Sequence, residues 1–500
     1  MTGITVGVTW SGLDVSNYMK GQSTYSTFID DNYVDPSSVN ITFPEQKRNL
    51  IYIFLESMEM TYADKENGGA FKQNVIPELT QLAQENEDFS GKSNKLNGGY
   101  SMPGTTWTMG AMFGQTSGLP LNISIDGNSM DTQDSFFPGI TTLGDILQNE
   151  GYSQTLLIGS EATFGGRKLY FTDHGQYDIM DYNYAQDNGL IPEDYKVWWG
   201  YEDEKLFGFA KEKLLELSQQ DNPFNLTMLT VDTHFEDGYV CDICPDTFGD
   251  NQYANVMACS SRRVKEFIDW VQQQDFAADT TIVISGDHQT MDSDFCEDVD
   301  KDYERRVYTT YINADAEKQT EKKRKYTIFD DFPTTLSAMG AEIEGDRLGL
   351  GTNLFSAKET LSEKEGVTVE YNKMLKKSKL MEKLSDIDEE EYRRKEEEKV
   401  SPTADVKIKK TGKDNQVLIK VENIEHLKKG LQSITAAVWK NEDQSDLQWV
   451  NLAVFENGIC KTKVDLSNYE PMQGEYNVHI YIIDGKGDAH NVAGTTFEIK

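Results

Sequence analysis

Ionisable side chains directly follow two apolar segments of the sequence. Glu56 immediately follows NLIYIFL (49–55). Asp287 and His288 follow TTIVIS (280–285), with Gly286 between that segment and Asp287. Carboxylate oxygens and an imidazole nitrogen are ligands for a divalent cation, and an adjacent Asp and His supply one of each kind. These three residues therefore predict a site for one divalent cation.

A glycine-rich segment, NGGYSMPGTTWTMG (97–110), contains the adjacent residues Thr105 and Thr106. Glycine lets the backbone turn tightly and approach a ligand, and proline fixes the entry angle. Taken alone, such a segment is typical of a surface turn. Beside a cation it predicts a threonine hydroxyl that completes the ligand shell, because a metal lowers the pKa of the hydroxyl and makes it a nucleophile.

Two further ionisable residues follow apolar segments. Arg167 lies in SEATFGGRK after SQTLLIG (153–159), and His234 lies in THF after FNLTMLTVD (224–232). Each alone is typical of a surface or loop residue. An arginine fork suits an anionic phosphoryl oxygen, and an imidazole can protonate a leaving alkoxide and later deprotonate an acceptor hydroxyl. Together with the cation site they predict phosphoryl transfer.

The histidine count favours one cation over two. The chain has six histidines, and only His174, His234 and His288 precede residue 358. A two-zinc phosphatase site usually takes about three imidazoles as ligands alone. A single-metal site fits this chain better.

Apolar runs alternate with helical patterns through the first part of the chain. The patterns predict helices over 141–152, 203–220 and 260–274, the last with Ser260 or Ser261 as its N-cap. Strands that alternate with helices indicate an α/β fold with a doubly wound, mostly parallel sheet. Ligands bind at the carboxyl ends of such strands, so the residues above should meet at one edge.

The sequence predicts four regions. Residues 1–46 are polar and predict an N-terminal arm, and residues 47–357 form the catalytic α/β domain. Residues 358–403 are rich in charge and in helix formers, which predicts a helical linker. Residues 404–500 alternate apolar and polar residues and predict a small all-β sandwich.

The overall composition excludes some classes of partner. The 500 residues carry a formal net charge of −36, which argues against nucleic acid and against docking on an anionic membrane surface. No run of about 18 apolar residues is present, so no membrane span is expected, and the residues after Met1 lack the features of a signal peptide.

Five cysteines leave several kinds of site open. Cys241 and Cys244 form a C-x-x-C, and Cys259, Cys296 and Cys460 follow. Zinc, a redox pair and structural disulfides are all possible. A four-thiolate zinc site more often shows two close pairs, so one or two disulfides in an oxidising compartment are the favoured interpretation.

Five motifs in order carry a family resemblance: IFLES, GTTWT ending in SGLP, GGRK, THF and SGDH. Over about residues 40–380 the chain resembles the lipoteichoic acid synthase and phosphoglycerol transferase family of the alkaline phosphatase–sulfatase superfamily. The resemblance implies a metal-dependent transferase that moves glycerol phosphate from phosphatidylglycerol, through a threonine intermediate, to a hydroxyl of a glycan or teichoic acid.

The resemblance also implies roles for single residues. Counted back from SGLP, Thr105 is the expected nucleophile and metal ligand, and Thr106 is its neighbour in the substrate site. Glu56, Asp287 and His288 match the family's ligands for Mn²⁺ or Mg²⁺, and Arg167 and His234 match its phosphoglycerol contacts. Gly165 stands where lipoteichoic acid synthases have a tryptophan, which favours modification of a glycan over polymer synthesis.

Two other functions are alternatives. Phosphoethanolamine transferases share the threonine and the metal, and an idle enzyme fold could serve as a non-catalytic glycan-binding surface protein. Sulfatase activity is disfavoured, because TTWTM (105–109) does not match the C/S-x-P-x-R motif that forms formylglycine. Metal content and hydrolysis of a glycerophosphoryl ester would separate an enzyme from an idle fold.

The resemblance extends to location and to the last module. Family members normally have transmembrane helices ahead of the catalytic domain, so this chain is expected to be a soluble extracellular portion that acts at a bacterial membrane or cell wall. Residues 404–500 resemble the Bsp-like repeat of bacterial surface proteins. The pattern includes Trp439, Trp449, Tyr476 and His479, which are expected to lie mainly in the core of the sandwich.

Overall fold

The computed structural model describes residues 24–399, 401–413, 415–427, 430–441, 443–454 and 458–499. The chain divides into two compact units, with the boundary between Glu389 and Glu390. Of the expected N-terminal arm, residues 1–23 lie outside the described residues. The rest of it forms short elements on the first unit, namely α3 (Phe28–Asn32), η1 (Pro36–Ser38) and β1 (Ile41–Thr42).

A seven-stranded sheet in the order β3-β8-β7-β2-β6-β4-β5 forms the centre of the first unit. Its strands β7, β2, β6, β4 and β5 are parallel, and β8 and β3 add antiparallel neighbours at one edge. The predicted α/β class is confirmed. The strands are β2 (Asn49–Leu55), β3 (Gly98–Gly99), β4 (Ser153–Ile158), β5 (Asp178–Met180), β6 (Phe224–Leu229), β7 (Thr280–Gly286) and β8 (Val307–Ile312).

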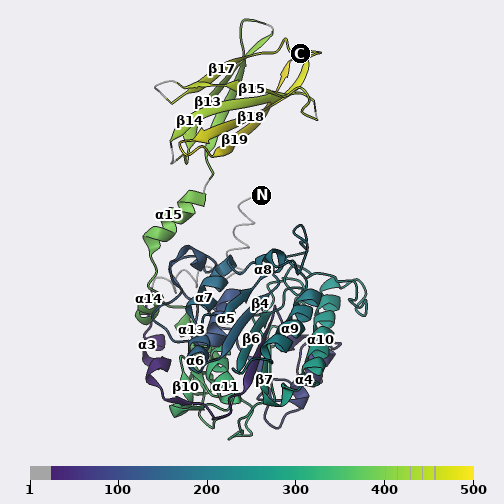
Figure 1. Ribbon diagram of the computed structural model, residues 1–500, viewed down its shortest axis with the longest axis vertical. Helices are drawn as coiled ribbons and strands as arrows, with labels where there is room; N and C mark the ends of the chain where they lie inside the picture. The colour runs from purple at the N-terminus through teal and green to yellow at the C-terminus, as the bar shows by residue number, and fades with distance from the viewer. Residues whose placement is uncertain are drawn as a thin grey trace. The chain divides into compact units, whose positions relative to one another are not determined.

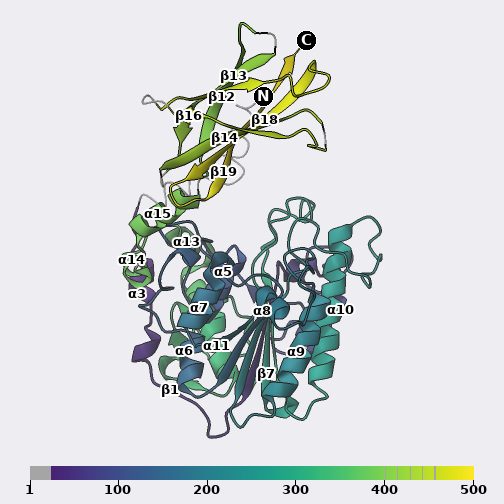
Figure 2. The same cartoon turned by 45° about the horizontal axis from the view of Figure 1, so that its top comes forward.

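Helices cover both faces of this sheet (Figures 1 and 2). On one face lie α4 (Pro77–Glu85), α9 (Asp203–Leu217) and α10 (Gln252–Val271). On the other lie α5 (Thr108–Ser117), α6 (Leu143–Asn149), α7 (Arg167–Asp173) and α11 (Asp331–Ala338). Because both faces are covered, β6, β7 and β8 are buried along their whole length, and β2 is buried from Leu50 onward.

Helix α10 begins earlier than its sequence pattern predicts. It starts at Gln252 instead of residue 260, and its N-cap is Asn251, whose side chain accepts a hydrogen bond from the Ala254 amide. The expected cap Ser261 lies inside the helix, where its hydroxyl donates to Glu78 at 2.8 Å. The early start places Cys259 within the helix.

Residues 361–385 form helices of the first unit. Glu363, in α12 (Leu361–Glu365), forms an ion pair of 3.0 Å with the buried Arg324. Two further helices are α13 (Val367–Met374) and α14 (Lys379–Ser385), and α15 (Glu389–Lys399) follows at the unit boundary. The segment predicted as a linker is therefore divided between the two units.

Short elements complete the first unit. These are η2 (Met60–Tyr62), η3 (Met130–Thr132), η4 (Phe164–Gly166), α8 (Tyr182–Asp187), η5 (Ala277–Asp279), η6 (Ile328–Asp330), β9 (Glu342–Ile343), η7 (Glu344–Asp346), β10 (Arg347–Leu348) and β11 (Gly351–Thr352). Strand β1 pairs with β9, and β10 pairs with β11. Within the described residues, no helix combines the length and the apolar character that crossing a membrane would require.

The second unit is the expected all-β module, with two four-stranded antiparallel sheets. The first sheet contains β12 (Thr403–Lys410), β13 (Gln416–Glu425), β16 (Ala453–Val454) and β17 (Cys460–Asp465). The second contains β14 (Leu431–Trp439), β15 (Gln448–Asn451), β18 (Gly474–Asp484) and β19 (Ala489–Ile499). Tyr476 and Trp439 are buried as expected, whereas Trp449 is 58% exposed and His479 is half-buried. The assignment of Trp449 to the core was wrong, because its side chain lies on the outer face of a short edge strand.

Candidate active site and metal centre

The candidate metal ligands lie at the carboxyl ends of two neighbouring strands. Glu56 follows β2, and Asp287 and His288 follow β7. The two strands are parallel and paired, with Leu55 opposite Gly286, so the residues that follow them emerge side by side. The structure brings all three predicted ligands together.

The ligand atoms of these residues surround one point. His288 Nε2 lies 3.4 Å from Glu56 Oε1 and 3.5 Å from Asp287 Oδ2. One ligand atom from each of the three residues lies within 4.8 Å of the other two. All three side chains are buried. A group of two carboxylates and one imidazole is a suitable donor set for a divalent cation.

Neighbouring groups orient these ligands. Asp287 Oδ1 accepts hydrogen bonds from the amides of Ser57 at 2.7 Å and of His288 at 2.6 Å. His288 Nδ1 donates to the Gln289 carbonyl at 2.7 Å, which leaves a lone pair on Nε2. Asp287 Oδ2 and His288 Nε2 are buried and have no hydrogen-bond partner among the described residues. Buried polar atoms normally have partners, so these two atoms fit a site built for a cation.

The two carboxylates of the group have pKa values shifted in opposite directions. Burial raises the pKa of Asp287 to about 8, and repulsion from Glu56 adds to this effect. Burial also opposes ionisation of Glu56, but attraction to His288 and His234 and the hydrogen bond from the Ser57 hydroxyl outweigh burial and lower its pKa to about 2. A bound cation would stabilise both carboxylates in their charged forms.

The structure does not bring Thr105 to this group. Its hydroxyl donates to the Met102 carbonyl at 2.9 Å and accepts from the Met102 amide at 2.8 Å, and the residue is fully buried. These bonds close a turn ahead of α5. The geometry therefore gives Thr105 a structural position, in contrast to the role that the motif count implies.

Thr108 is the threonine of this segment whose hydroxyl contacts a candidate metal ligand. Its hydroxyl donates to Glu56 Oε2 at 3.1 Å, and its side chain is only partly buried. Thr108 is the first residue of α5, where unpaired backbone N–H groups and the helix dipole favour an anion. The sequence analysis missed this residue, although a threonine just before a helical pattern in a glycine-rich segment was a usable signal.

Thr106 lies apart from the metal ligands. It is exposed and lines a small cavity of about 180 Å³ together with Trp107, Leu121 and Tyr371. The described contacts do not join it to Glu56, Asp287 or His288. A role for Thr106 in substrate binding stays a prediction.

Arg167 faces the metal ligands from the start of α7. It is 6% exposed, and its Nη2 donates to the Glu161 carbonyl at 2.7 Å. Burial lowers the pKa of Arg167 to about 10, while attraction to Glu56, Asp181 and Asp287 opposes this shift. Its Nε is buried without a partner among the described residues, so a donor remains for an anionic ligand.

His234 lies on the loop after β6. Its Nδ1 donates to the Phe235 carbonyl at 2.7 Å, so that Nε2 is left as an acceptor when the ring is neutral. The ring lies between two aromatic side chains, with centroid distances of 4.9 Å to both Trp199 and Phe235. Its charge, when present, lowers the pKa of Glu56, which places it near the cation site.

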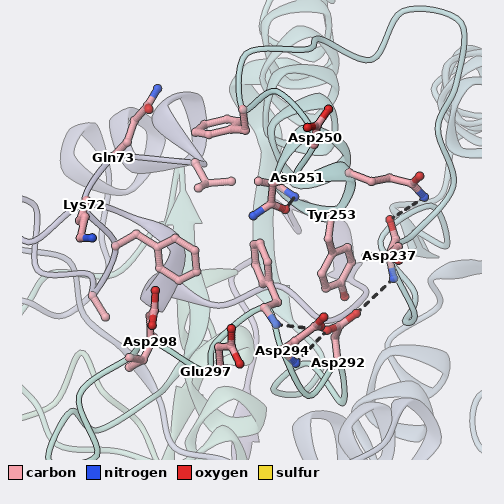
Figure 3. Close-up of a pocket in the computed structure, with 18 of the residues that line it drawn as sticks. Lys72, Gln73, Asp237, Asp250, Asn251, Tyr253, Asp292, Asp294, Glu297 and Asp298 are labelled. Carbon is pink, nitrogen blue, oxygen red and sulfur yellow. Dashed lines mark hydrogen bonds between the residues drawn. The ribbon is translucent and has the colours of Figure 1, made fainter.

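A large cavity opens on the loops that leave the site. Its volume is about 680 Å³, and Tyr253, Phe71 and Phe295 form part of its wall. Figure 3 shows Asp237 hydrogen-bonded to Asp292 beside Tyr253. Tyr253 donates to the Thr233 carbonyl at 2.7 Å, and Thr233 donates to the Glu56 carbonyl at 2.6 Å. These two hydrogen bonds link the cavity wall to the backbone of the candidate ligand Glu56.

Carboxylates dominate the lining of this cavity. Two lysines oppose six acidic residues, which are Asp237, Asp250, Asp292, Asp294, Glu297 and Asp298. Lys65 and Lys72 are the two cations. Carboxylate oxygens accept hydrogen bonds from hydroxyl groups but repel phosphate.

Known proteins similar to this chain include transferases of phosphate-containing groups. Residues 48–341 match the family model described as sulfatase, and residues 406–497 match the model of the GBS Bsp-like repeat. The chain is 32% identical over 331 residues to phosphoglycerol transferase I of Escherichia coli (strain 55989 / EAEC), covering 65% of this chain and 41% of that protein. It therefore spans less than half the length of this curated relative.

The solved structures that match the chain share little sequence with it. The lipoteichoic acid synthase LtaP from Listeria monocytogenes is 17% identical with a TM-score of 0.48, and the match covers 66% of this chain and 81% of that one. The C-terminal periplasmic domain of EcEptC from Escherichia coli, in complex with Zn, is 14% identical with a TM-score of 0.44, and the match covers 66% and 92%. Since the sulfatase model alone matches more than half of the residues, the chain belongs to the sulfatase family.

Proposed function

We propose that the protein is a metal-dependent phosphoglycerol transferase that passes glycerol phosphate from phosphatidylglycerol through Thr108 to a hydroxyl acceptor. One observation carries the proposal: the Thr108 hydroxyl, at a helix N-terminus, contacts Glu56 in a group whose buried Asp287 and His288 atoms lack partners. The relatives named phosphoglycerol transferase I support the choice of the transferred group.

The nucleophile is assigned to Thr108 instead of Thr105. Glu56, Asp287 and His288 would hold the cation, for which Mn²⁺ or Mg²⁺ suits the oxygen-rich donor set. When bound, the cation supplies positive charge that lowers the pKa of a neighbouring hydroxyl and offsets the charge of a phosphoryl group. Thr108 attacks phosphorus from the start of α5, where the backbone N–H groups favour the phosphoryl oxygens.

Arg167 and His234 complete the proposed reaction. The Nε–H of Arg167, which has no partner among the described residues, would donate a hydrogen bond to an anionic phosphoryl oxygen. Because the Arg167 side chain is buried, this hydrogen bond would be stronger than one at the surface. His234 protonates the diacylglycerol oxygen as it leaves, and then removes the proton from the acceptor hydroxyl that attacks the phosphothreonine. The hydrogen bond from Nδ1 to Phe235 fixes the tautomer for this exchange.

The acidic cavity favours a neutral acceptor. Six carboxylates would repel a chain of glycerol phosphate units, whereas they can accept hydrogen bonds from the hydroxyls of a sugar. Aromatic side chains of the wall that are only partly buried, such as Phe71 and Phe295, suit the apolar face of a sugar ring. We therefore favour a glycan over a teichoic acid as acceptor, with transfer at the outer face of a bacterial membrane or in the cell wall.

A lipid comparison tests this function. The full chain is incubated with Mn²⁺ and detergent-dispersed phosphatidylglycerol or phosphatidylethanolamine, and diacylglycerol release is measured with and without a neutral oligosaccharide. We expect Mn²⁺-dependent release from phosphatidylglycerol that rises with the oligosaccharide. Release from phosphatidylethanolamine alone would identify a phosphoethanolamine transferase, and no release from either lipid would favour a glycan-binding surface protein.

The substitution Arg167→Lys tests the arginine fork. Lysine keeps the charge but loses the planar donors, so we expect turnover to fall by about 10²-fold while Mn²⁺ affinity is retained. Steady-state kinetics and metal titration measure the two effects. Lys168→Ala is the matched control, because it removes an exposed cation one residue along the chain. An equal loss of turnover in both variants would argue against a contact between Arg167 and the phosphoryl group.

A further inference from the structure

Three cysteines meet at the junction between a loop and a helix of the first unit. Cys241 and Cys244 lie on the loop between β6 and α10, and Cys259 lies within α10. Cys241 Sγ is 3.3 Å from Cys244 Sγ and 3.5 Å from Cys259 Sγ. Cys241 and Cys259 are buried, and Cys244 is half-buried. The three sulfurs therefore surround a point that is largely shielded from solvent.

Two arginine side chains and a backbone amide lie beside the cluster. Arg263 Nη2 lies 3.2 Å from Cys241 Sγ, and Arg262 Nη2 lies 3.8 Å from Cys259 Sγ. The Cys241 amide also donates to Cys244 Sγ at 3.3 Å. Thiolate, not thiol, is the form that ligates metals.

A single disulfide would not explain why all three sulfurs lie together. One disulfide would use two of the sulfurs and leave the third as a thiol beside it. In contrast, sulfurs that share one tetrahedral Zn²⁺ at about 2.3 Å are separated by roughly 3.8 Å, close to the two observed distances. All three sulfurs would then have the same role.

We propose that Cys241, Cys244 and Cys259 form a second metal site, for a soft divalent cation such as Zn²⁺, with a fourth position open to water or to an outside ligand. Three thiolates and one divalent cation leave one net negative charge, and the Arg263 guanidinium beside Cys241 balances it. The same Nη2 of Arg263 also donates to a carboxylate oxygen of Glu204 at 3.1 Å, which helps to hold the guanidinium in place.

The two metal sites would select different cations. Oxygen and imidazole ligands at Glu56, Asp287 and His288 suit Mn²⁺ or Mg²⁺, whereas thiolates suit Zn²⁺. The cysteine site would tie the loop that carries His234 to α10. The proposal of a cysteine metal site does not depend on the proposed phosphoglycerol transfer, because it rests on the positions of the three sulfurs and of the arginines beside them.

Cobalt titration of the full chain, purified under reducing conditions, tests the second site. Co²⁺ bound by thiolates gives an intense sulfur-to-cobalt charge-transfer absorption, which a site of oxygen and imidazole ligands does not give. We expect this absorption to saturate at one equivalent in the parent chain and to be displaced by Zn²⁺. We expect Cys259→Ser to abolish it and Cys296→Ser, a cysteine of the same unit outside the cluster, to retain it.

Two results would overturn the proposal. The first is a parent chain that shows no charge-transfer absorption although its thiols are free by labelling. The second is an intact mass that is lower by two hydrogens, with peptide mapping to a disulfide within the cluster, in chain that was never exposed to an oxidant. Cys244→Ser provides a second variant if Cys259→Ser does not fold, because Cys244 is half-buried.

Discussion

Replacing Thr108 with alanine is expected to lower turnover by at least about 10⁴-fold, because loss of a nucleophile removes the covalent route. Release of diacylglycerol from phosphatidylglycerol measures the effect. Metal affinity should change little, since Glu56, Asp287 and His288 supply the ligand group without Thr108. Thr108→Ser should retain part of the activity, because a serine hydroxyl can take the same position at the start of α5.

Thr105→Ala is the matched control for this substitution. It removes a threonine of the same segment whose hydroxyl is bonded only to the Met102 backbone in the described contacts. We expect the free energy of unfolding to fall by about 1 kcal/mol, because these hydrogen bonds are removed. Turnover of the folded protein should be nearly unchanged. A loss of turnover confined to Thr105→Ala would return the nucleophile to the position that the motif count implies.

Asp287→Asn is expected to separate stability from metal binding. The amide keeps an oxygen for the Ser57 and His288 amides but removes a carboxylate whose pKa burial raises to about 8. Without metal, the variant should therefore be as stable as the parent or more stable. Mn²⁺ at about a hundredfold excess over its Kd should stabilise the parent by about 2.7 kcal/mol and the variant hardly at all.

Thermal unfolding with and without Mn²⁺ measures this difference, and turnover should fall by roughly 10³-fold or more in the variant. Asp331→Asn is the matched control, because Asp331 is also fully buried and burial raises its pKa to about 8. It lies in α11, outside the candidate metal group, and should keep the Mn²⁺ response. A Tm increase by Mn²⁺ that persists in Asp287→Asn would argue against the ligand assignment.

The clustering of the candidate metal ligands could be predicted because their positions follow from strand ends alone. Strands buried on both faces are visible as apolar runs, and Glu56 and Asp287 come at or just after the points where two such runs end. Pairing of β2 with β7 then brings the residues together without any further information. The α/β class could be predicted for the same reason.

The threonine that contacts Glu56 could not be located in this way. Thr105 and Thr108 are both threonines in one glycine-rich segment, and which of them contacts Glu56 depends on the residue at which α5 begins. Apolar periodicity does not fix a helix start to within three residues. The start of α10 was also predicted too late, so the sequence did not place Cys259 within that helix.

The covalent intermediate tests the central claim most directly. The chain is mixed with phosphatidylglycerol and Mn²⁺ in the absence of an acceptor, quenched in acid, and digested, and the peptide that contains residues 105–108 is fragmented by tandem mass spectrometry. The account predicts a glycerophosphoryl group on Thr108 that is absent when Mn²⁺ is removed. A glycerophosphoryl group on Thr105 or Thr106, or turnover with no modified threonine, would contradict it.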